Sequence, residues 1–194
     1  MIEGGGHSSK LNSKSIHYTN AVRRNTKNQK RILAIYPSSR GFGFSVLEGR
    51  DRLIDWGVVQ TKDDKHRRTI ARVTRFMARY TPDEVVTEDP MKSPYRSARI
   101  RKLLAGVQDL AVMKRVQWRG VSRGQVRETF RTSGPVTKYR IAQGIAGHFP
   151  ELASRLPPPR KPWMSEDARM AIFDAVAVAL TVALSNKPAL KLDQ

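Results

Sequence analysis

The sequence of 194 residues contains no cysteine, which excludes both a disulfide framework and a zinc site built on thiolates. Histidine is also scarce, and the four residues are scattered without the spacing of metal ligands: His7, His17, His66 and His148. Any bound metal ion would therefore be held by oxygen ligands.

Long apolar runs are missing as well. No segment reaches the length of about 20 apolar residues that spans a bilayer, and the N-terminal region has no apolar core of the signal-peptide type. We therefore expect no membrane partner, and a cytoplasmic protein associated with the nucleoid. Acids are almost absent from the first residues, which leaves an organelle matrix as a less favoured alternative.

Acidic residues are few in the whole chain. There are 36 Lys and Arg against 17 Asp and Glu, which gives a formal net charge of +19 and a pI near 10.9. This imbalance exceeds what solubility requires and indicates a polyanionic partner. The basic residues are spread over several segments, so nucleic acid is favoured over a membrane surface. A merely basic, solvated surface is the alternative.

The length and composition predict one domain with a tail at each end. Residues 1–29 are rich in Gly, Ser, Asn, Lys and Arg and have no apolar periodicity, so we expect a flexible basic N-terminal tail. The folded domain is expected over 30–186, followed by a C-terminal tail over 187–194.

All the predicted strands lie before residue 122. Three apolar segments separated by turn residues predict an antiparallel meander: RILAIYP, GFGFSVLEG and DRLIDWGVVQ. Apolar residues at three- and four-residue spacing predict an amphipathic helix over 64–80, with arginines on its outer face. A short strand is expected in TPDEVVTEDP, then a helix over 95–115 and a strand over 116–121.

The second half is predicted to be mainly helical. A helical turn is expected over 126–130 and a helix from Pro135 to Phe149, followed by the Pro-rich connector LPPPRKPWM. The last helix, over 166–185, is apolar on nearly all sides and should therefore be buried. This order of elements predicts an α/β fold with a mixed sheet.

Two acidic residues stand in apolar surroundings. Glu88 lies at the end of a predicted strand, and Asp174 lies within the most apolar helix of the chain. A carboxylate in such a helix is costly unless a cation neutralises it, and together the two residues could hold Mg²⁺ or Mn²⁺. The alternative is that Asp174 is paired with an arginine such as Arg169 or Arg40.

Four blocks of the sequence resemble RuvC-type Holliday junction resolvases, a family of the RNase H-like superfamily. The run AIYPSSRGFGFSVL, which begins at Ala34, is similar to the opening strand and turn of that family, and DEVVTED is similar to its second acidic strand. Two later blocks are similar to its basic region and its terminal helix: GQVRETFRTSGPVTKYRIAQGIAGHF and FDAVAVALTVAL. The resemblance covers about residues 31–185.

The resemblance implies an RNase H-like fold, a mixed five-stranded sheet flanked by helices, in a protein that binds branched DNA. It places Glu88 at the family's catalytic glutamate, Asp174 at its final metal-binding aspartate and Lys138 at a basic residue near the substrate. It also implies Mg²⁺ or Mn²⁺ as the cofactor of an active enzyme, and a homodimer.

The sequence departs from the family pattern at two positions. Tyr36 replaces the first-strand aspartate, and a phenol that is neutral at pH 7 cannot supply its charge. Ala171 stands one helical turn before Asp174, where the family has a further acid. Cleavage by the usual mechanism is therefore expected to be impaired or lost.

Other residues offer alternatives for this site. Three acids are candidate substitutes for the missing ligands: Asp89, Glu166 and Asp167. Asp89 should point to the opposite face if its strand is regular. Tyr36 is expected to fill the vacated metal site; stacking of its ring on a base is a less favoured alternative. A tyrosine nucleophile is less favoured still, because no activating set of basic residues is evident nearby.

Basic residues near the four blocks are the candidates for contacting nucleic acid. They are Arg40, Arg96, Arg99, Lys102, Arg127, Lys138 and Arg140. The polar loop over 93–99 is a further candidate, whereas Trp118 and Phe130 are expected in the core.

The leading hypothesis is a RuvC-like protein that binds branched or structured DNA, with RNA as a second ligand class, and whose nuclease activity is impaired or lost. One alternative is an active Mg²⁺-dependent junction endonuclease with a site rebuilt around Glu88, Asp174 and Asp89. Another is a structural subunit of a nucleoprotein assembly.

Overall fold

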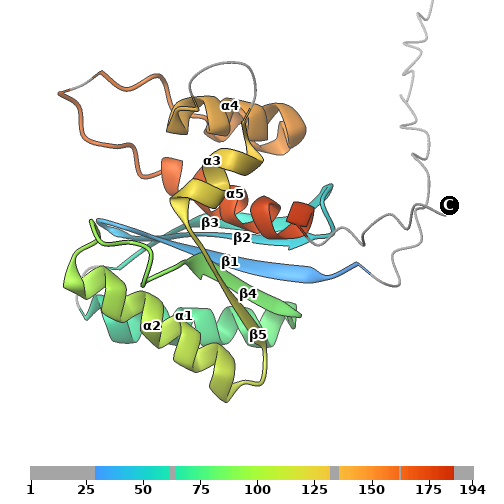
Figure 1. Cartoon of the computed structure of the whole chain (residues 1–194), viewed down its shortest axis with the longest axis vertical. Coiled ribbons are helices and arrows are strands. Elements are labelled where there is room, and N and C mark those ends of the chain that lie inside the picture. Colours follow the sequence, from blue (N-terminus) through green and yellow to red (C-terminus); the bar gives the residue numbers. More distant parts are fainter. Residues whose placement is uncertain (1–28, 62–63, 132–135, 162, 186–194) are drawn as a thin grey trace, which may run out of the picture.

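The computed structural model describes residues 29–61, 64–131, 136–161 and 163–185. Figure 1 shows a central β-sheet with helices on both of its faces. The predicted tails lie almost entirely outside the described residues, as does Pro135 at the start of a predicted helix. The domain boundaries therefore stay predictions.

The sheet has five strands in the order β3-β2-β1-β4-β5. β1 Arg31–Ser38, β2 Gly41–Glu48 and β3 Arg52–Gln60 form the predicted antiparallel meander. β4 Glu84–Glu88 pairs with β1 in parallel, and β5 Gln117–Val121 pairs with β4 in parallel. The prediction of a mixed five-stranded sheet flanked by helices is confirmed.

β1 separates two apolar clusters, because its side chains alternate between the two faces of the sheet. Ile32, Ala34 and Tyr36 belong to one cluster. Leu33 and Ile35 belong to the other. All five side chains are buried, so β1 is the centre of the fold and presents Tyr36 to only one of its two faces.

The helices α1 Lys65–Tyr80 and α2 Ala98–Met113 cover the face of the sheet opposite to Tyr36 (Figure 1). α1 is amphipathic as predicted: its apolar side chains pack on the sheet and its arginines are exposed. α2 begins three residues later than predicted, because the Ser97 hydroxyl accepts a hydrogen bond from the N–H of Ile100 and caps the helix there.

The helices α3 Arg123–Thr129, α4 Lys138–His148 and α5 Met170–Ser185 lie on the other face of the sheet (Figure 1). α5 is buried along most of its length, as predicted, but it begins at Met170 instead of residue 166. None of the helices in the described part of the chain has the length and apolar character needed to cross a membrane.

Two short helices differ from the prediction. α3 is longer than the turn predicted over 126–130, because Ser122 and Gln125 form a capping box that starts the helix at Arg123. A 3-10 helix, η2 Pro150–Arg155, follows α4 and was not predicted. Proline fits the first turn of such a helix, because that position needs no N–H donor.

α5 lies directly on β2 at Gly43. A Cβ atom at this position would lie 2.0 Å from the carbonyl oxygen of Ala171, a distance that no side chain tolerates. Glycine is therefore required for this close approach of helix and strand. Ala171 is itself buried, one turn before Asp174, so the contact fixes where Asp174 faces the sheet.

Candidate nucleic-acid interface

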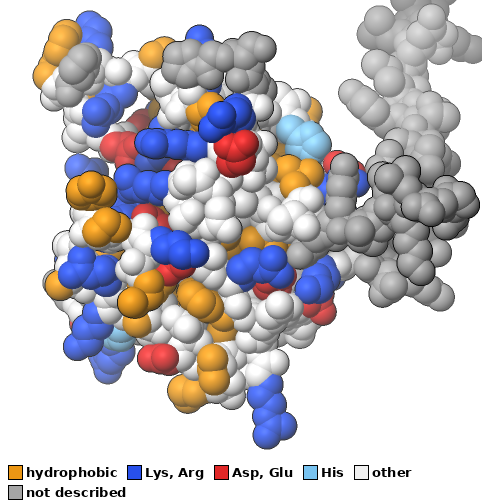
Figure 2. Space-filling view, viewed as in Figure 1, with side chains coloured by type: hydrophobic (Ala, Val, Ile, Leu, Met, Phe, Trp, Pro, Cys, Tyr) orange, Lys and Arg blue, Asp and Glu red, His pale blue; other side chains and the backbone are white. Residues whose placement is uncertain are grey.

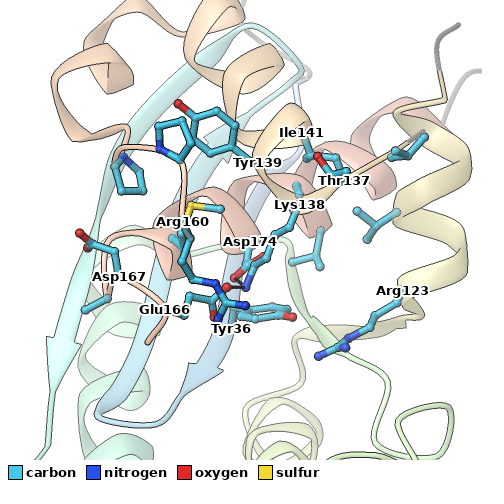
Figure 3. A pocket seen from close by; sticks show the side chains of 18 of the residues that line it. Tyr36, Arg123, Thr137, Lys138, Tyr139, Ile141, Arg160, Glu166, Asp167 and Asp174 are labelled. Carbon is cyan, nitrogen blue, oxygen red and sulfur yellow. Dashed lines mark hydrogen bonds and ion pairs between the residues drawn. The ribbon is translucent and has the colours of Figure 1, made fainter. Parts of the chain in front are cut away.

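A pocket lies at the edge of the sheet where the parallel strands end. The carboxyl ends of β1, β4 and β5 meet at this edge, which is where ligands bind in open α/β sheets. The pocket has a volume of about 1140 Å³ and lies between α3, α4, the start of α5 and the Pro-rich connector. Figure 3 shows Tyr36, Lys138 and Asp174 pointing toward one another inside it.

The structure brings Tyr36, Glu88 and Asp174 together. Ile35 pairs with Thr87 in the register of β1 and β4, so the next residues, Tyr36 and Glu88, are neighbours on adjacent strands. Asp174 projects from α5 and lines the same pocket. The convergence that the sequence resemblance implied is therefore present, with a phenol where the family has a carboxylate.

Both carboxylate oxygens of Glu88 are engaged by side chains of the chain itself. Oε1 accepts a hydrogen bond from Ser93 Oγ at 2.8 Å and lies 3.3 Å from Arg123 Nε. Oε2 accepts hydrogen bonds from Arg96 Nε at 2.8 Å and Nη2 at 2.6 Å. Burial raises the pKa of this carboxyl, but the hydrogen bonds and charge of Arg96 outweigh burial and hold the pKa below its usual value. Glu88 is therefore an ionised, paired carboxylate.

Asp174 is paired with Lys138. Its Oδ2 lies 2.7 Å from Lys138 Nζ, which also donates to Glu166 Oε1 at 2.6 Å. Burial raises the pKa of the Asp174 carboxyl to about 6, and the positive charge of Lys138 offsets this effect only in part. Lys138 thus bridges Asp174 of α5 and Glu166 of the loop that precedes α5.

The remaining acids of this region have other partners. Asp167 forms an ion pair with Arg169 at 2.7 Å. Asp174 has a cationic partner, as in the alternative considered from the sequence, but that partner is Lys138 and not Arg169 or Arg40. Asp89 lies 3.8 Å from Lys92 and is not among the residues that line the pocket. None of the three predicted substitutes therefore joins Glu88 and Asp174 as a free ligand.

The ring of Tyr36 lies close to two cations. The guanidinium carbon of Arg96 is 5.1 Å from the ring centroid, and Lys138 Nζ is 5.8 Å from it, within the range of cation–π attraction. Burial, and then the charges of Asp174 and Glu88, raise the pKa of the Tyr36 phenol above its usual value. Tyr36 is therefore a neutral group at pH 7 that the surrounding cations contact through its ring.

This set of side chains does not fit a divalent metal ion. Mg²⁺ and Mn²⁺ are held by carboxylate, carbonyl and water oxygens, whereas the partners of Glu88 and Asp174 are three cationic side chains and a serine hydroxyl. Among the residues that the structure describes, no group of three or more His, Cys, Asp or Glu could hold a metal ion. The geometry therefore gives no support to the predicted Mg²⁺ or Mn²⁺ site.

Comparison with known proteins identifies the fold. No protein-family model and no curated protein matches the chain. A structure of Thermus thermophilus RuvC matches with a TM-score of 0.59 and 23% sequence identity, and the match covers 80% of this chain and 95% of that chain. A structure of T. thermophilus RuvC in complex with a Holliday junction substrate matches with a TM-score of 0.57 and 20% identity, over 80% and 94% of the two chains. The chain has the RuvC fold.

Within the RuvC fold, the basic residues predicted to bind nucleic acid divide into two groups. Arg40, Arg127 and Lys138 line the pocket, and Arg96 contacts Glu88 beside it. Three others are exposed but do not line the pocket: Arg140 on α4, and Arg99 and Lys102 on α2. Because α2 covers the opposite face of the sheet, Arg99 and Lys102 lie away from a ligand in the pocket.

Two further arginines line the pocket and were not predicted to bind a ligand, Arg123 and Arg160. Arg123 follows the end of β5, so its place after a parallel strand was a usable signal in the sequence. Arg160 reaches from the connector toward Asp174 (Figure 3), and nothing in the sequence indicates that course. Figure 2 shows Lys and Arg side chains, with acids among them, gathered on this side of the molecule.

Two aromatic residues, Trp118 and Phe130, are partly buried against the core. Trp118 and Phe130 each pack against one of the two apolar clusters, so the prediction that they are core residues is confirmed. The loop over 93–99 has two roles: Ser93 and Arg96 point inward to Glu88, whereas Tyr95 is almost fully exposed. The inward residues hold Glu88, and the outward part of the loop is exposed to solvent.

Proposed function

We propose that the chain binds branched or structured DNA through phosphate contacts in this pocket and does not cut it by metal-dependent chemistry. The observation that carries the proposal is the group of three cations, Arg96, Arg123 and Lys138, around the neutral Tyr36. These positive side chains surround the positions at which the sequence resemblance places metal-binding carboxylates. Association with the nucleoid is part of the same proposal.

The cations are accessible enough to meet a phosphate. The exposed fraction of the side chain is 20% for Arg96, 39% for Lys138 and 57% for Arg123. Arginine offers paired N–H groups that match phosphate oxygens, and lysine offers a compact charge. The likeness in fold to RuvC in complex with a Holliday junction substrate supports a branched ligand over a linear one.

The side chains of the pocket have different roles in binding a phosphate. Lys138 Nζ is shared by Asp174 and the half-exposed Glu166, so an entering phosphate competes with Glu166 for this cation. Arg96 remains on Glu88 and neutralises a carboxylate that would repel the phosphate. Tyr36 adds a neutral surface. The lining of the pocket carries five cations, Arg40, Arg123, Arg127, Lys138 and Arg160, against four acids, Glu88, Glu166, Asp167 and Asp174, so its net charge is positive.

The binding test compares a labelled four-way DNA junction with a linear duplex of the same sequence. The pocket variant, Arg123→Gln/Arg127→Gln, removes two cations of α3 that line the pocket. The matched control, Arg50→Gln/Arg155→Gln, removes two exposed cations elsewhere. Loss of two phosphate contacts should flatten the slope of log affinity against log salt by about 2 in the pocket variant, whereas the control should leave it unchanged. Equal slopes in all three proteins would contradict the proposal.

Cutting is measured in the same samples with Mg²⁺ or Mn²⁺ added. We expect binding without cutting, both for the natural sequence and for Glu88→Gln. Cutting that disappears in Glu88→Gln would instead establish an active endonuclease with a rebuilt site. Equal affinity for junction and duplex would exclude branch recognition, and tighter binding to an RNA junction would assign RNA as the ligand. Sedimentation of the complex counts the bound copies, for which we propose a homodimer.

A further inference from the structure

The outer face of α1 carries positive charge that the pocket does not use. We infer that this face is a second binding surface, which contacts the phosphate backbone of nucleic acid. α1 packs on one face of the sheet and α5 on the other (Figure 1), and the pocket is lined by residues of α3, α4 and α5. The surface is therefore separate from the pocket, and its activity goes beyond the function proposed above.

Four arginines form a row along α1, which we call the arginine stripe: Arg68, Arg72, Arg75 and Arg79. Their spacing of four, three and four residues places them on one side of the helix. All four are exposed. At a rise of about 1.5 Å per residue the stripe is about 16 Å long, which matches about five phosphates along one DNA strand.

The stripe is unfavourable for the helix that carries it. Its consecutive arginines are three or four residues apart, where like charges destabilise a helix. α1 contains no acidic residue that would offset this repulsion. In the described part of the chain, the ion pair found for an arginine of α1 joins Arg67, which is outside the stripe, to Asp64. An anionic partner would supply the charge that the stripe lacks.

The chemistry of this face favours nucleic acid over a membrane or a protein partner. Ala71 and Ala78 are the exposed neighbours of the stripe, and their small side chains allow a phosphate backbone to approach closely. The large exposed apolar side chains of the described residues all lie outside α1, so this face offers no anchor for a bilayer or for an apolar interface. All four cations are arginines, whose planar groups bind phosphate through two N–H groups at once.

The position of the stripe has a consequence for the bound nucleic acid. α1 lies on the opposite face of the sheet from α3, α4 and α5, whose residues line the pocket, so we expect the stripe and the pocket to bind separate segments of nucleic acid. A molecule that binds phosphate on both surfaces holds two segments of nucleic acid at the same time. The inference therefore predicts that the protein bridges two duplexes.

A capture assay tests this bridging. Beads that carry a linear duplex are incubated with the full chain and then with a labelled second duplex, and the retained label is measured. The stripe variant, Arg68→Gln/Arg72→Gln/Arg75→Gln, should retain at least tenfold less label than the natural sequence. The charge-conserving variant, Arg68→Lys/Arg72→Lys/Arg75→Lys, should retain most of it. Capture by the stripe variant at the natural level would overturn the inference.

A control variant tests whether capture depends on the arginine stripe or only on the net charge of the chain. Arg50→Gln/Lys114→Gln/Arg155→Gln removes three exposed charges from three places outside α1, and capture should persist. An equal loss in the control and stripe variants would overturn the inference, because net charge alone would explain it. Vesicle binding that falls in the stripe variant while capture of DNA persists would assign the face to a membrane and would also overturn it.

The salt dependence of binding to a single duplex distinguishes this inference from the function proposed for the pocket. In a protein whose pocket is already weakened by Arg123→Gln/Arg127→Gln, the three substitutions of the stripe variant should flatten the slope of log affinity against log salt by about 3, because the duplex then binds through the stripe and three phosphate contacts are lost. This result supports the stripe even if the pocket variant behaves like the natural sequence. An unchanged slope after these three substitutions counts against the stripe whatever the pocket variant does.

Discussion

Arg96 holds the most deeply buried charge of the pocket in place. Its guanidinium donates two hydrogen bonds to the nearly inaccessible Glu88 and lies over the ring of Tyr36. Arg123 also approaches Glu88, but its side chain is more than half exposed. Removing the partner of a buried charge is costly, whereas an exposed ion pair contributes little. The two arginines should therefore differ in their effect on stability.

This difference is measurable by urea unfolding at pH 7. We expect Arg96→Ala to lower the free energy of unfolding by about 3 kcal/mol, because Glu88 loses its closest cation in a buried setting. Arg123→Ala is the matched control and should lower it by less than about 1 kcal/mol. Equal losses in the two variants would show that Arg96 is not the main partner of Glu88.

Asp174 should make stability depend on pH. Its pKa is raised by burial from 3.8 to about 6, so the fold favours the neutral carboxyl. Its contribution to the free energy of unfolding is therefore full below about pH 4 and is lost as the pH rises through about 6. The gap between the two pKa values corresponds to about 3 kcal/mol.

The measurement is urea unfolding at several pH values for the natural sequence and Asp174→Asn. We expect the stability of the natural sequence relative to Asp174→Asn to fall by about 3 kcal/mol between pH 4 and pH 7.5. Asparagine does not titrate in this range, so the difference between the two proteins reports on Asp174 and on the groups coupled to it, Lys138 and Glu166. Parallel curves would mean that Asp174 keeps its ordinary pKa.

The residues of the site were predictable to different degrees. The neutrality of Tyr36 followed from the ordinary pKa of a phenol, and burial reinforces it. Arg96 was predicted to contact nucleic acid, yet it forms an ion pair with Glu88, which lies eight residues earlier in the chain. The path of the intervening loop decides this contact, and no periodicity in the sequence specifies that path.

The contact between β2 and α5 depends on the absence of one side chain. The backbone of α5 approaches Gly43 so closely that even a methyl group would overlap the carbonyl oxygen of Ala171. Two rigid elements must then move apart, and α5 carries Asp174 with it. Gly43 is therefore a position at which the packing of elements controls the geometry of the pocket.

Gly43→Ala tests this dependence. We expect it to lower the free energy of unfolding by at least about 2 kcal/mol, because backbone cannot yield as a flexible side chain does. Gly144→Ala is the matched control: it lies in α4 with nothing within 4 Å of the added Cβ, so it should raise stability by up to about 1 kcal/mol. Thermal unfolding of both variants measures the difference. An unchanged stability of Gly43→Ala would show that α5 can shift to accommodate the added methyl group.

Elements with a regular spacing of apolar residues were predictable from the sequence. The positions at which capped helices begin were predicted less well. α1 follows from its apolar spacing, and β1 to β3 follow from apolar segments broken by turn residues. The beginnings of α2 and α3 were misplaced, because each depends on a serine whose side chain caps the helix. η2 was not predicted, because a 3-10 helix of six residues is too short to leave a periodic pattern of apolar residues.

At the scale of the whole molecule, total charge was evident from the sequence but its distribution was not. The charge of +19 predicted a polyanionic partner without indicating a surface. The fold assigns Arg123 and Lys138 to one face of the sheet and the arginine stripe to the other. Arg99 and Lys102 were grouped with the pocket residues, and only the tertiary structure places them on the far side.

The cations around Tyr36 are covalent parts of the chain. A protein that attracts phosphate through bound magnesium loses that attraction whenever the free ion becomes scarce or a chelator removes it. Arg96, Arg123 and Lys138 are held in place by Glu88 and Asp174 and cannot diffuse away. If the pocket binds phosphate as proposed, a chelator of divalent ions should leave that binding in place.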